Sequence, residues 1–388
     1  MRVSSRLIAR GAALLGVLGV AAVVAPAAAS AASGSSTVVG HVYLNDNTTG
    51  TNTIADFDRH ADGSLTPTPG SPFTTGGAGT GTGLASQGAI QVSPDGRFLL
   101  AVDAGSDQVS VLRIKSDGTL QQIPGGTVSS GGSQPVSIAI HGDLVYVANA
   151  GNSASNYTGF TLDEGGRLDR LPRSTVPLAA GSQPGDVLFN GDGTKLVGTR
   201  VGTSLIDSFV VHRNGRLSAG PGSPYAAEGV GPFGSEFRPT DPSQLFVSNA
   251  HNGAGAGTVS AFEDDALGAL TSIGGSPFAN DQTAPCWVEI SHDGQFLFAV
   301  NTASGTISRY SIADDGSLTL LGSTAVSATG GVGAVDAQLS PDGATLFVNE
   351  SRIASVGAFA VSGGDLTELT SSPTALPAGA TPAGIAVR

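Results

Sequence analysis

The sequence predicts an all-β protein, a seven-bladed β-propeller whose four-stranded blades form a closed ring. Three observations lead to this prediction. A unit of four short strands recurs along the chain, seven markers of its fourth strand lie 48 to 55 residues apart, and the chain begins and ends partway through a unit. A small twisted sheet buries its faces only against neighbouring sheets, so units of this kind are expected to close on one another.

The clearest copy of the unit spans residues 285–318. It holds four runs rich in β-branched and aromatic residues, each ended by turn residues. The runs cover residues 288–290, 296–300 and 306–312, and the fourth begins at Leu318. Four such runs in succession indicate a four-stranded meander.

A proline or a substitute opens the first strand of each unit, five residues before the last apolar residue of that strand. These markers are Gln87, Pro135, Pro184, Pro232, Pro285, Ala334 and Pro382. The turn to the second strand carries Asp and Gly, as in Ser93-Pro-Asp-Gly96. Asp bonds its own backbone there and Gly tolerates positive φ, so both are expected to be structural.

A Gly-x-Leu sequence marks the turn into the fourth strand. The leucines are Leu65, Leu120, Leu168, Leu217, Leu270, Leu318 and Leu366, which gives seven blades. Residues 38–46 match a second strand with no first strand before them, and residues 381–388 match a first strand with nothing after them. We therefore expect the C-terminal strand to complete the N-terminal blade, pairing edges that would otherwise be exposed.

The N-terminus has the layout of a secretory signal peptide. Arg2, Arg6 and Arg10 precede an apolar run over residues 11–25, and Pro26 and small residues follow it. We assign residues 1–31 to the signal and residues 32–388 to a single propeller domain, secreted to the outside of the cell. The alternative, a membrane anchor, needs a longer apolar run, so no stable membrane insertion is expected after cleavage.

The net charge and the cysteine content limit which binding partners and which covalent cross-links this chain can have. Loss of the three signal arginines moves the formal charge from −13 to −16, and nucleic-acid binding calls for clustered Lys and Arg, so nucleic acid is excluded as a partner. The single cysteine, Cys286, forms no intrachain disulfide. We expect a monomer without a cofactor.

The repeat residues carry a family resemblance. Residues 89–103, AIQVSPDGRFLLAVD, and the later Asp117-Gly-Thr-Leu120 resemble blades of the lactonase-type seven-bladed propellers, and Val145-Tyr-Val-Ala-Asn149 is similar to bacterial YVTN repeats. That family includes 6-phosphogluconolactonase-like and carboxymuconate-cyclase-like proteins. The resemblance covers residues 38–388. It implies an enzyme that hydrolyses or forms a small lactone of the sugar-acid or muconate type.

A polar residue ends each second strand, at the face where propellers commonly bind ligands. The set is Asp46, Asp103, Asn149, Arg200, Asn249, Asn301 and Glu350. Asn and Asp also cap strands, so Asp103 and Asn301 are either substrate-binding or structural. Arg200 and Glu350 break the pattern and are either functional or members of structural ion pairs. An oxygen-rich ring suits Ca²⁺, but Arg200 would repel it, so no metal site is predicted.

The first strands add carboxylates that would line the channel, where they need partners or water. Glu289, Asp336 and Glu350 are candidate general bases for lactone chemistry, and Arg200 is the candidate to hold the developing oxyanion. Trp287 either stacks on a ring substrate or packs between blades. His251 lies in a loop at the expected mouth and is a candidate substrate ligand.

Two functions remain open from the sequence. The first is a lactone hydrolase or related cycloisomerase, acting on a small lactone. The second is a non-catalytic extracellular propeller that binds a glycan or a protein through its channel-mouth loops. The sequence contains neither G-x-S-x-G nor H-E-x-x-H, the common signatures of serine hydrolases and zinc proteases. These motifs therefore do not help to choose between the two functions.

Overall fold

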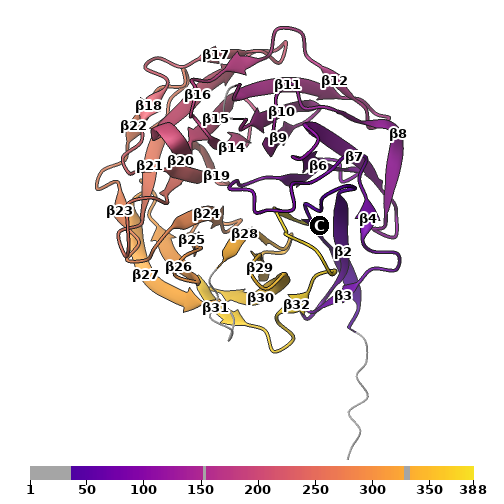
Figure 1. The fold of residues 1–388 in the computed structure, drawn as a ribbon. Helices are drawn as coiled ribbons and strands as arrows, with labels where there is room; N and C mark the ends of the chain where they lie inside the picture. The colour runs from indigo at the N-terminus through magenta and orange to yellow at the C-terminus, as the bar shows by residue number, and fades with distance from the viewer. Residues whose placement is uncertain (1–35, 152–153, 327–332) are drawn as a thin grey trace, which may run out of the picture. The chain divides into compact units, whose positions relative to one another are not determined.

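The computed structural model describes residues 36–151, 154–326 and 333–388. The predicted signal peptide, residues 1–31, lies outside them. The described residues form seven antiparallel sheets arranged around a centre (Figure 1), with one 3₁₀ turn, η1 (Val201–Thr203), and no α-helix in these ranges. No helix in the described part is long and apolar enough to span a membrane. The predicted all-β, seven-bladed architecture is confirmed.

Each blade runs from an innermost to an outermost strand, and some blades add a short strand after the outermost one. Blade 1 is β33 (Ile385–Val387), β1 (Val38–Asn45), β2 (Thr53–His60), β3 (Leu65–Pro67) and β4 (Phe73–Thr74). Blade 2 is β5 (Ile90–Val92), β6 (Phe98–Asp103), β7 (Gln108–Ile114) and β8 (Leu120–Ser129). Blade 3 is β9 (Pro135–His141), β10 (Leu144–Asn149), β11 (Asn156–Leu162), β12 (Leu168–Arg170) and β13 (Val176–Pro177).

The remaining blades follow the same order. Blade 4 is β14 (Pro184–Phe189), β15 (Lys195–Arg200), β16 (Leu205–Val211), β17 (Leu217–Ala219) and β18 (Tyr225–Ala226). Blade 5 is β19 (Pro232–Arg238), β20 (Asp241–Asn249), β21 (Thr258–Asp264), β22 (Leu270–Ser272) and β23 (Phe278–Ala279). Blade 6 is β24 (Pro285–Ile290), β25 (Phe296–Asn301), β26 (Thr306–Ile312) and β27 (Leu318–Ala325). Blade 7 is β28 (Ala334–Leu339), β29 (Thr345–Glu350), β30 (Ser355–Ser362), β31 (Asp365–Glu368) and β32 (Thr374–Ala375).

The ring closes through the C-terminal strand, as predicted. Val387, Ala386 and Ile385 of β33 pair antiparallel with Val42, Tyr43 and Leu44 of β1, which ends the first blade on its inner side. The innermost strands also contact one another in sequence around the ring, with β33 lying between β28 and β5. In the described residues β33 thus supplies the innermost strand that blade 1 would otherwise lack, and this closes the ring.

The fourth strand is interrupted in five blades, a feature that the repeat pattern did not predict. A short piece such as β3 pairs with the third strand, the chain leaves it, and a two-residue piece such as β4 returns to it. At each gap a serine hydroxyl accepts the third-strand N–H that has lost its backbone partner. The serines are Ser71, Ser174, Ser223, Ser276 and Ser372, with N···O distances of 2.9 to 3.0 Å. The side chain keeps a buried donor satisfied, so the interruption costs little.

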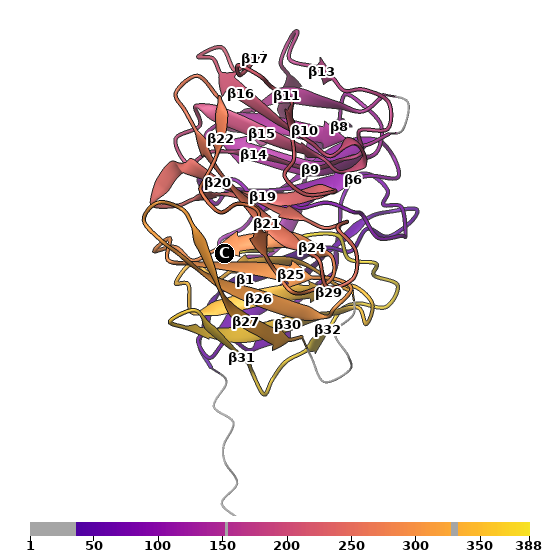
Figure 2. The same cartoon turned by 90° about the vertical axis from the view of Figure 1, so that its left-hand side faces the viewer.

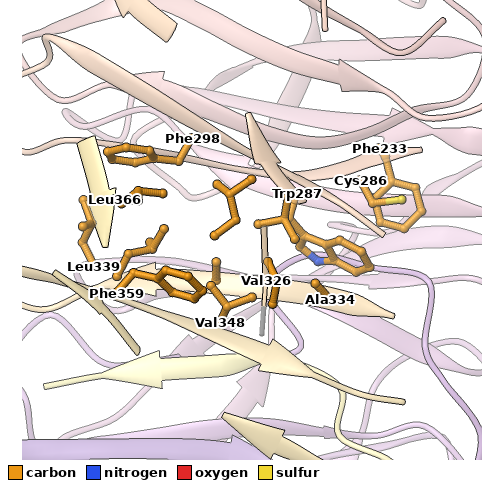
Figure 3. Packing of buried hydrophobic residues seen from close by; sticks show 14 of the residues in the cluster. Phe233, Cys286, Trp287, Phe298, Val326, Ala334, Leu339, Val348, Phe359 and Leu366 are labelled. Atoms are coloured by element: carbon orange, nitrogen blue, oxygen red, sulfur yellow. The ribbon is translucent and has the colours of Figure 1, made fainter. Parts of the chain in front are cut away.

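Adjacent blades pack face to face around the ring, which Figure 2 shows from the side, and buried apolar side chains fill the spaces between them. The cluster spanning blades 5, 6 and 7 contains Phe233, Trp287, Phe298 and Phe359, each less than a tenth exposed (Figure 3). Because each blade buries both faces against its neighbours, the strands read as nearly continuous apolar runs, and the polar residues within them stand out.

The segment between β4 and β5 leaves the rim and reaches into the middle of the ring (Figure 1). There Ser86 and Gln87 bond to blades on the other side. Gln87 N–H donates to Gly185 O at 2.9 Å, and its side-chain amide bonds both the N–H and the C=O of Val288 at 3.2 and 3.3 Å. The Trp287 indole N–H donates to Ser86 O at 2.8 Å. This segment therefore ties blade 2 to blades 4 and 6 across the centre.

Candidate functional site

The polar residues Asn301 and Asp103, which end second strands, are bonded within the ring, Asn301 to its own blade and Asp103 to its own blade and to blade 1. Asn301 is fully buried, and its amide donates to Thr306 Oγ1 and Ser308 Oγ on the third strand at 3.0 and 2.9 Å. Asp103 is also fully buried and accepts bonds from Asn52, Thr75 and Ser110 at 2.5 to 2.9 Å. These bonds support a structural role for Asp103 and Asn301 over a substrate-binding one.

Arg200 lies in a buried ion pair within blade 4. Its Nε and Nη2 donate to the two carboxylate oxygens of Asp207 at 2.6 and 2.5 Å, and Tyr157 of blade 3 donates its hydroxyl to the same carboxylate at 3.1 Å. Burial raises the pKa of Asp207, and the bond from Arg200 opposes that rise. Asp207 follows Arg200 by seven residues, as Ser308 follows Asn301 in blade 6. Blade 4 therefore departs from the repeat at both positions, and the charges of Arg200 and Asp207 compensate each other.

Glu350 is buried at the equivalent place in blade 7, with Ser355 Oγ 3.5 Å from its carboxylate. The long side chain fits because Gly357 stands opposite. A Cβ at Gly357 would lie 2.5 Å from Glu350 Oε1. This departure from the repeat is again matched by a change seven residues further on.

The channel-facing carboxylates join neighbouring blades. Leu339 N–H of blade 7 donates to Glu289 Oε1 of blade 6 at 2.8 Å, and Val387 N–H of the next blade donates to Gln338 Oε1 at 2.7 Å. Glu289 and Gln338 occupy the same place in their strands, so Glu or Gln serves equally as the acceptor. These side chains satisfy inner-edge N–H groups that have no strand beside them.

A second layer of acids lies two positions nearer the mouth. Asp186 accepts Ser137 Oγ at 3.1 Å and the Oγ and N–H of Ser235 at 2.7 and 3.0 Å, so it connects blades 3, 4 and 5. Asp336 bonds the N–H of Ala337 at 3.0 Å and lies close enough to Asp186 for the two charges to interact. The structure brings Glu289 and Asp336 into the same electrostatic neighbourhood, while Arg200 is held in its own ion pair.

Burial dominates the titration of these groups. It raises the pKa of Asp186 and Asp336 to about 7, against bonds that lower it. It also raises the pKa of Glu236 and Glu289, and repulsion between the two acids adds to the effect on Glu236. Each group thus holds its proton more tightly in the folded chain than in an unfolded one.

Stability is expected to fall as pH rises. The contribution of these protons is fully present below about pH 4, the pKa of unfolded carboxyls. It is lost as pH passes through about 7 for Asp186 and Asp336 and about 8 for Glu289. The melting temperature at pH 8 should be about 5 °C lower than at pH 5, measured by calorimetry. Glu289→Gln should flatten this slope without lowering stability at neutral pH, because Gln338 already performs the same bonding in the next blade. A melting temperature that is constant or rises from pH 5 to pH 8 would refute the argument.

Trp287 and Cys286 are packing residues. The Trp287 ring is 4% exposed and meets Phe233 edge to face, with ring centroids 5.0 Å apart (Figure 3). Together with the indole bond to Ser86, this supports the packing alternative for Trp287 over stacking on a substrate. Cys286 is buried, which raises the pKa of its thiol to about 11 and keeps it protonated.

A pocket of about 320 Å³ opens where blades 3, 4 and 5 meet the central segment. Its apolar lining residues are Ala85, Val136, Ala150, Pro184, Val201 and Phe233, and its polar ones are Gln134, Gln183 and His251. The three polar residues are exposed, whereas Val136, Pro184, Val201 and Phe233 are buried, so polar groups surround an apolar floor. Of the predicted site residues, His251 alone lines this pocket.

The backbone at the rim positions the polar groups. Gln134 and Gln183 each precede the proline of a first strand and adopt positive φ, 53° and 46°. The His251 ring lies against Gly231, where a Cβ would be 2.6 Å from its Cγ and Nδ1. Sequence reasoning missed the two glutamines, although both stand directly before the marker prolines. It found His251 from its place in a mouth loop.

The arrangement resembles small-molecule sites in general, which combine a concave apolar surface with a few convergent polar groups. Among described residues no group of three or more His, Cys, Asp or Glu side chains is placed to hold a metal ion. Chemistry in this pocket would rest on one imidazole and two amides.

Solved structures with a similar fold include a putative 6-phosphogluconolactonase from Bacteroides uniformis ATCC 8492, 19% identical with a TM-score of 0.72, over 91% of this chain and 100% of that one. The periplasmic gluconolactonase PpgL of Pseudomonas aeruginosa is 17% identical with a TM-score of 0.70, over 90% of this chain and 98% of that one. At these identities the likeness shows the fold alone. No curated protein matches the chain. Residues 41–189 and 237–382, well over half of the chain, match the model of the lactonase, seven-bladed β-propeller family, and the chain therefore belongs to that family.

Proposed function

We propose that this protein hydrolyses a small lactone in the pocket at the channel mouth. The observation that carries the proposal is the pocket itself, where His251, Gln134 and Gln183 surround an apolar floor of a size suited to a single ring. Membership of the lactonase family points to the same reaction class. The reaction is therefore assigned to the exposed residues of the pocket rim, and not to Arg200 and the buried carboxylates that the sequence suggested.

His251 is the proposed general base. The imidazole takes a proton from water as the oxygen attacks the lactone carbonyl carbon, and amide N–H groups of Gln134 or Gln183 stabilise the tetrahedral oxyanion. The ring C–O bond then breaks, and the imidazolium returns the proton to the leaving alkoxide. Lactone and water give a hydroxy acid, and no further reactant is needed.

Replacing His251 with Ala is expected to lower kcat for lactone hydrolysis by roughly 10²-fold, with little change in melting temperature, because the side chain is exposed and supports no core. Acid release measured against a panel of lactones would provide the rates. His292→Ala is the matched control, since His292 is exposed in the turn between β24 and β25 at the opposite end of the strands. Equal rates in the two variants would remove His251 from the mechanism.

A second candidate function is binding without turnover. It is favoured by the way Asp103, Arg200, Glu289 and Asn301 are all engaged in structural bonds, which leaves few groups for catalysis. In that case a glycan or protein would occupy the same mouth loops. A ligand that raises the melting temperature and is recovered unchanged supports this function, whereas acid release supports hydrolysis.

Export also remains a proposal. The signal layout of residues 1–31 supports it, and an extracellular propeller would meet small lactones directly. Expression of the full chain beside a chain lacking residues 1–31 checks this, since only the full chain should reach the culture medium.

A further inference from the structure

The mouth pocket offers no positive charge to a ligand. No lysine or arginine is among the described residues that line it. Arg200 is adjacent to the lining residue Val201 in sequence, but its Nε and Nη2 donate to the carboxylate of Asp207 and it does not line the pocket. Phosphate and carboxylate ligands are held in proteins mainly by Arg and Lys, and this pocket lacks them.

The backbone around the pocket does not replace the missing cations. Bare N–H groups at a turn can form an anion-binding nest. In this pocket the N–H groups of the loops after the second strands donate to carbonyls of the same rim. These groups belong to Ala150, Val201, Gly202, Ala250 and His251, and their N···O distances are 2.9 to 3.1 Å. An anion would find these donors already bonded.

A carboxyl group lies beneath the pocket floor. Asp186 follows the lining residue Pro184 by two positions on β14, about 7 Å along the strand. It is 2% exposed and bonded to Ser137 and Ser235 of the flanking blades, so it does not move away from a ligand. The chain as a whole carries a formal charge of −13. This overall negative charge opposes an anionic ligand. Asp186 offers such a ligand no positive charge and adds a negative one wherever it is ionised, which its pKa of about 7 places at and above neutral pH.

The rim extends the apolar surface outward. Val230 is 53% exposed, and its carbonyl accepts the N–H of His251 at 2.9 Å, which places it beside the pocket. A large apolar side chain held open to solvent at a pocket rim suits contact with a ligand. The floor and this valine together offer an apolar path from the pocket to its edge.

From these observations we propose that the ligand is an uncharged lactone bearing an apolar substituent, and not a lactone that carries a phosphate or carboxylate. This inference rests on the proposed function for the site but concerns only what the site accepts. The amides of Gln134 and Gln183 can each donate to and accept from a neutral ring, and the substituent lies on the floor and against Val230.

Binding of lactams tests the ligand class without requiring turnover, because a lactam keeps the ring and carbonyl of a lactone and resists hydrolysis. Calorimetric titration would use 6-phenyl-2-piperidone, gluconolactam and gluconolactam 6-phosphate. The phenyl lactam is expected to bind at least ~10-fold more tightly than the phosphate. Val230→Ser should weaken the phenyl lactam several-fold and leave gluconolactam unchanged.

An added cation should reverse the preference. Gln183→Arg is expected to tighten gluconolactam 6-phosphate by ~10-fold, since one arginine then faces the pocket. Gln121→Arg is the matched control, because Gln121 is exposed on β8 and adds the same charge away from the pocket. The inference is overturned if the phosphate binds wild type as tightly as the phenyl lactam, or if none of the three binds. Tight binding of the phenyl lactam with no hydrolysis of any lactone would instead reject the proposed hydrolysis and keep the ligand class.

Discussion

Deleting residues 381–388 should abolish the stable ring. The deletion removes β33, whose Ile385 and Ala386 are 4% and 3% exposed, together with its pairing to β1. It also removes the Val387 N–H that bonds Gln338 of blade 7 and the reciprocal backbone bonds between Arg388 and His41, at 2.8 and 2.9 Å. The deletion thus removes contacts from three blades, because β33 pairs with β1 of blade 1 and also contacts β28 of blade 7 and β5 of blade 2.

The expected loss is more than about 5 kcal/mol, from about 2 kcal/mol for a buried Ile and about 1 kcal/mol for each backbone hydrogen bond. That is a large share of the stability of a typical domain. The melting temperature should fall by roughly 10 °C, or the chain should fail to accumulate in soluble form. A synthetic peptide of residues 379–388 should restore part of the loss, and a scrambled peptide should not. An unchanged, cooperative transition in the deleted chain would contradict closure by β33.

Local repetition explains why the fold could be predicted. The first strands end at the predicted apolar residues in blades 1, 2, 4, 6 and 7, and the Gly-x-Leu leucines begin the fourth strands of all blades except the last, where β31 starts one residue earlier. A sequence motif that recurs in every blade, such as Gly-x-Leu, reflects a local backbone geometry that all the blades share. The interrupted fourth strands escaped prediction because a two-residue piece such as β4 is too short to show a period.

The site depends on contacts that the repeat does not encode. Alignment of the blades found Arg200 and Glu350 as departures, but their roles depend on Asp207 and Gly357 across the strand pair. A comparison seven residues further along would have revealed both partners. The path of Ser86 across the centre could not be found in this way, since it bonds Trp287 from a distance of 201 residues in sequence.

Replacing Arg200 with Ala is expected to destabilise the protein by about 3–5 kcal/mol, because Asp207 would remain buried with no positive partner. The double variant Arg200→Asn with Asp207→Ser should recover most of this loss. Its two side chains are those of Asn301 and Ser308 in blade 6, which form a direct bond of 2.9 Å at the same place. Thermal unfolding of the wild type, both single variants and the double variant gives the coupling energy between the two positions.

The same double variant separates a structural role for Arg200 from a catalytic one. It restores the fold while removing the guanidinium, so any loss of activity would not be due to unfolding. If Arg200 held the oxyanion, lactone turnover would fall at least ~10²-fold in a variant of normal stability. We expect turnover to stay within a few-fold of wild type, since the guanidinium is held by Asp207 through Nε and Nη2 and lines no part of the mouth pocket. A stable but inactive double variant would return Arg200 to the active site and place the chemistry in blade 4 instead of at His251.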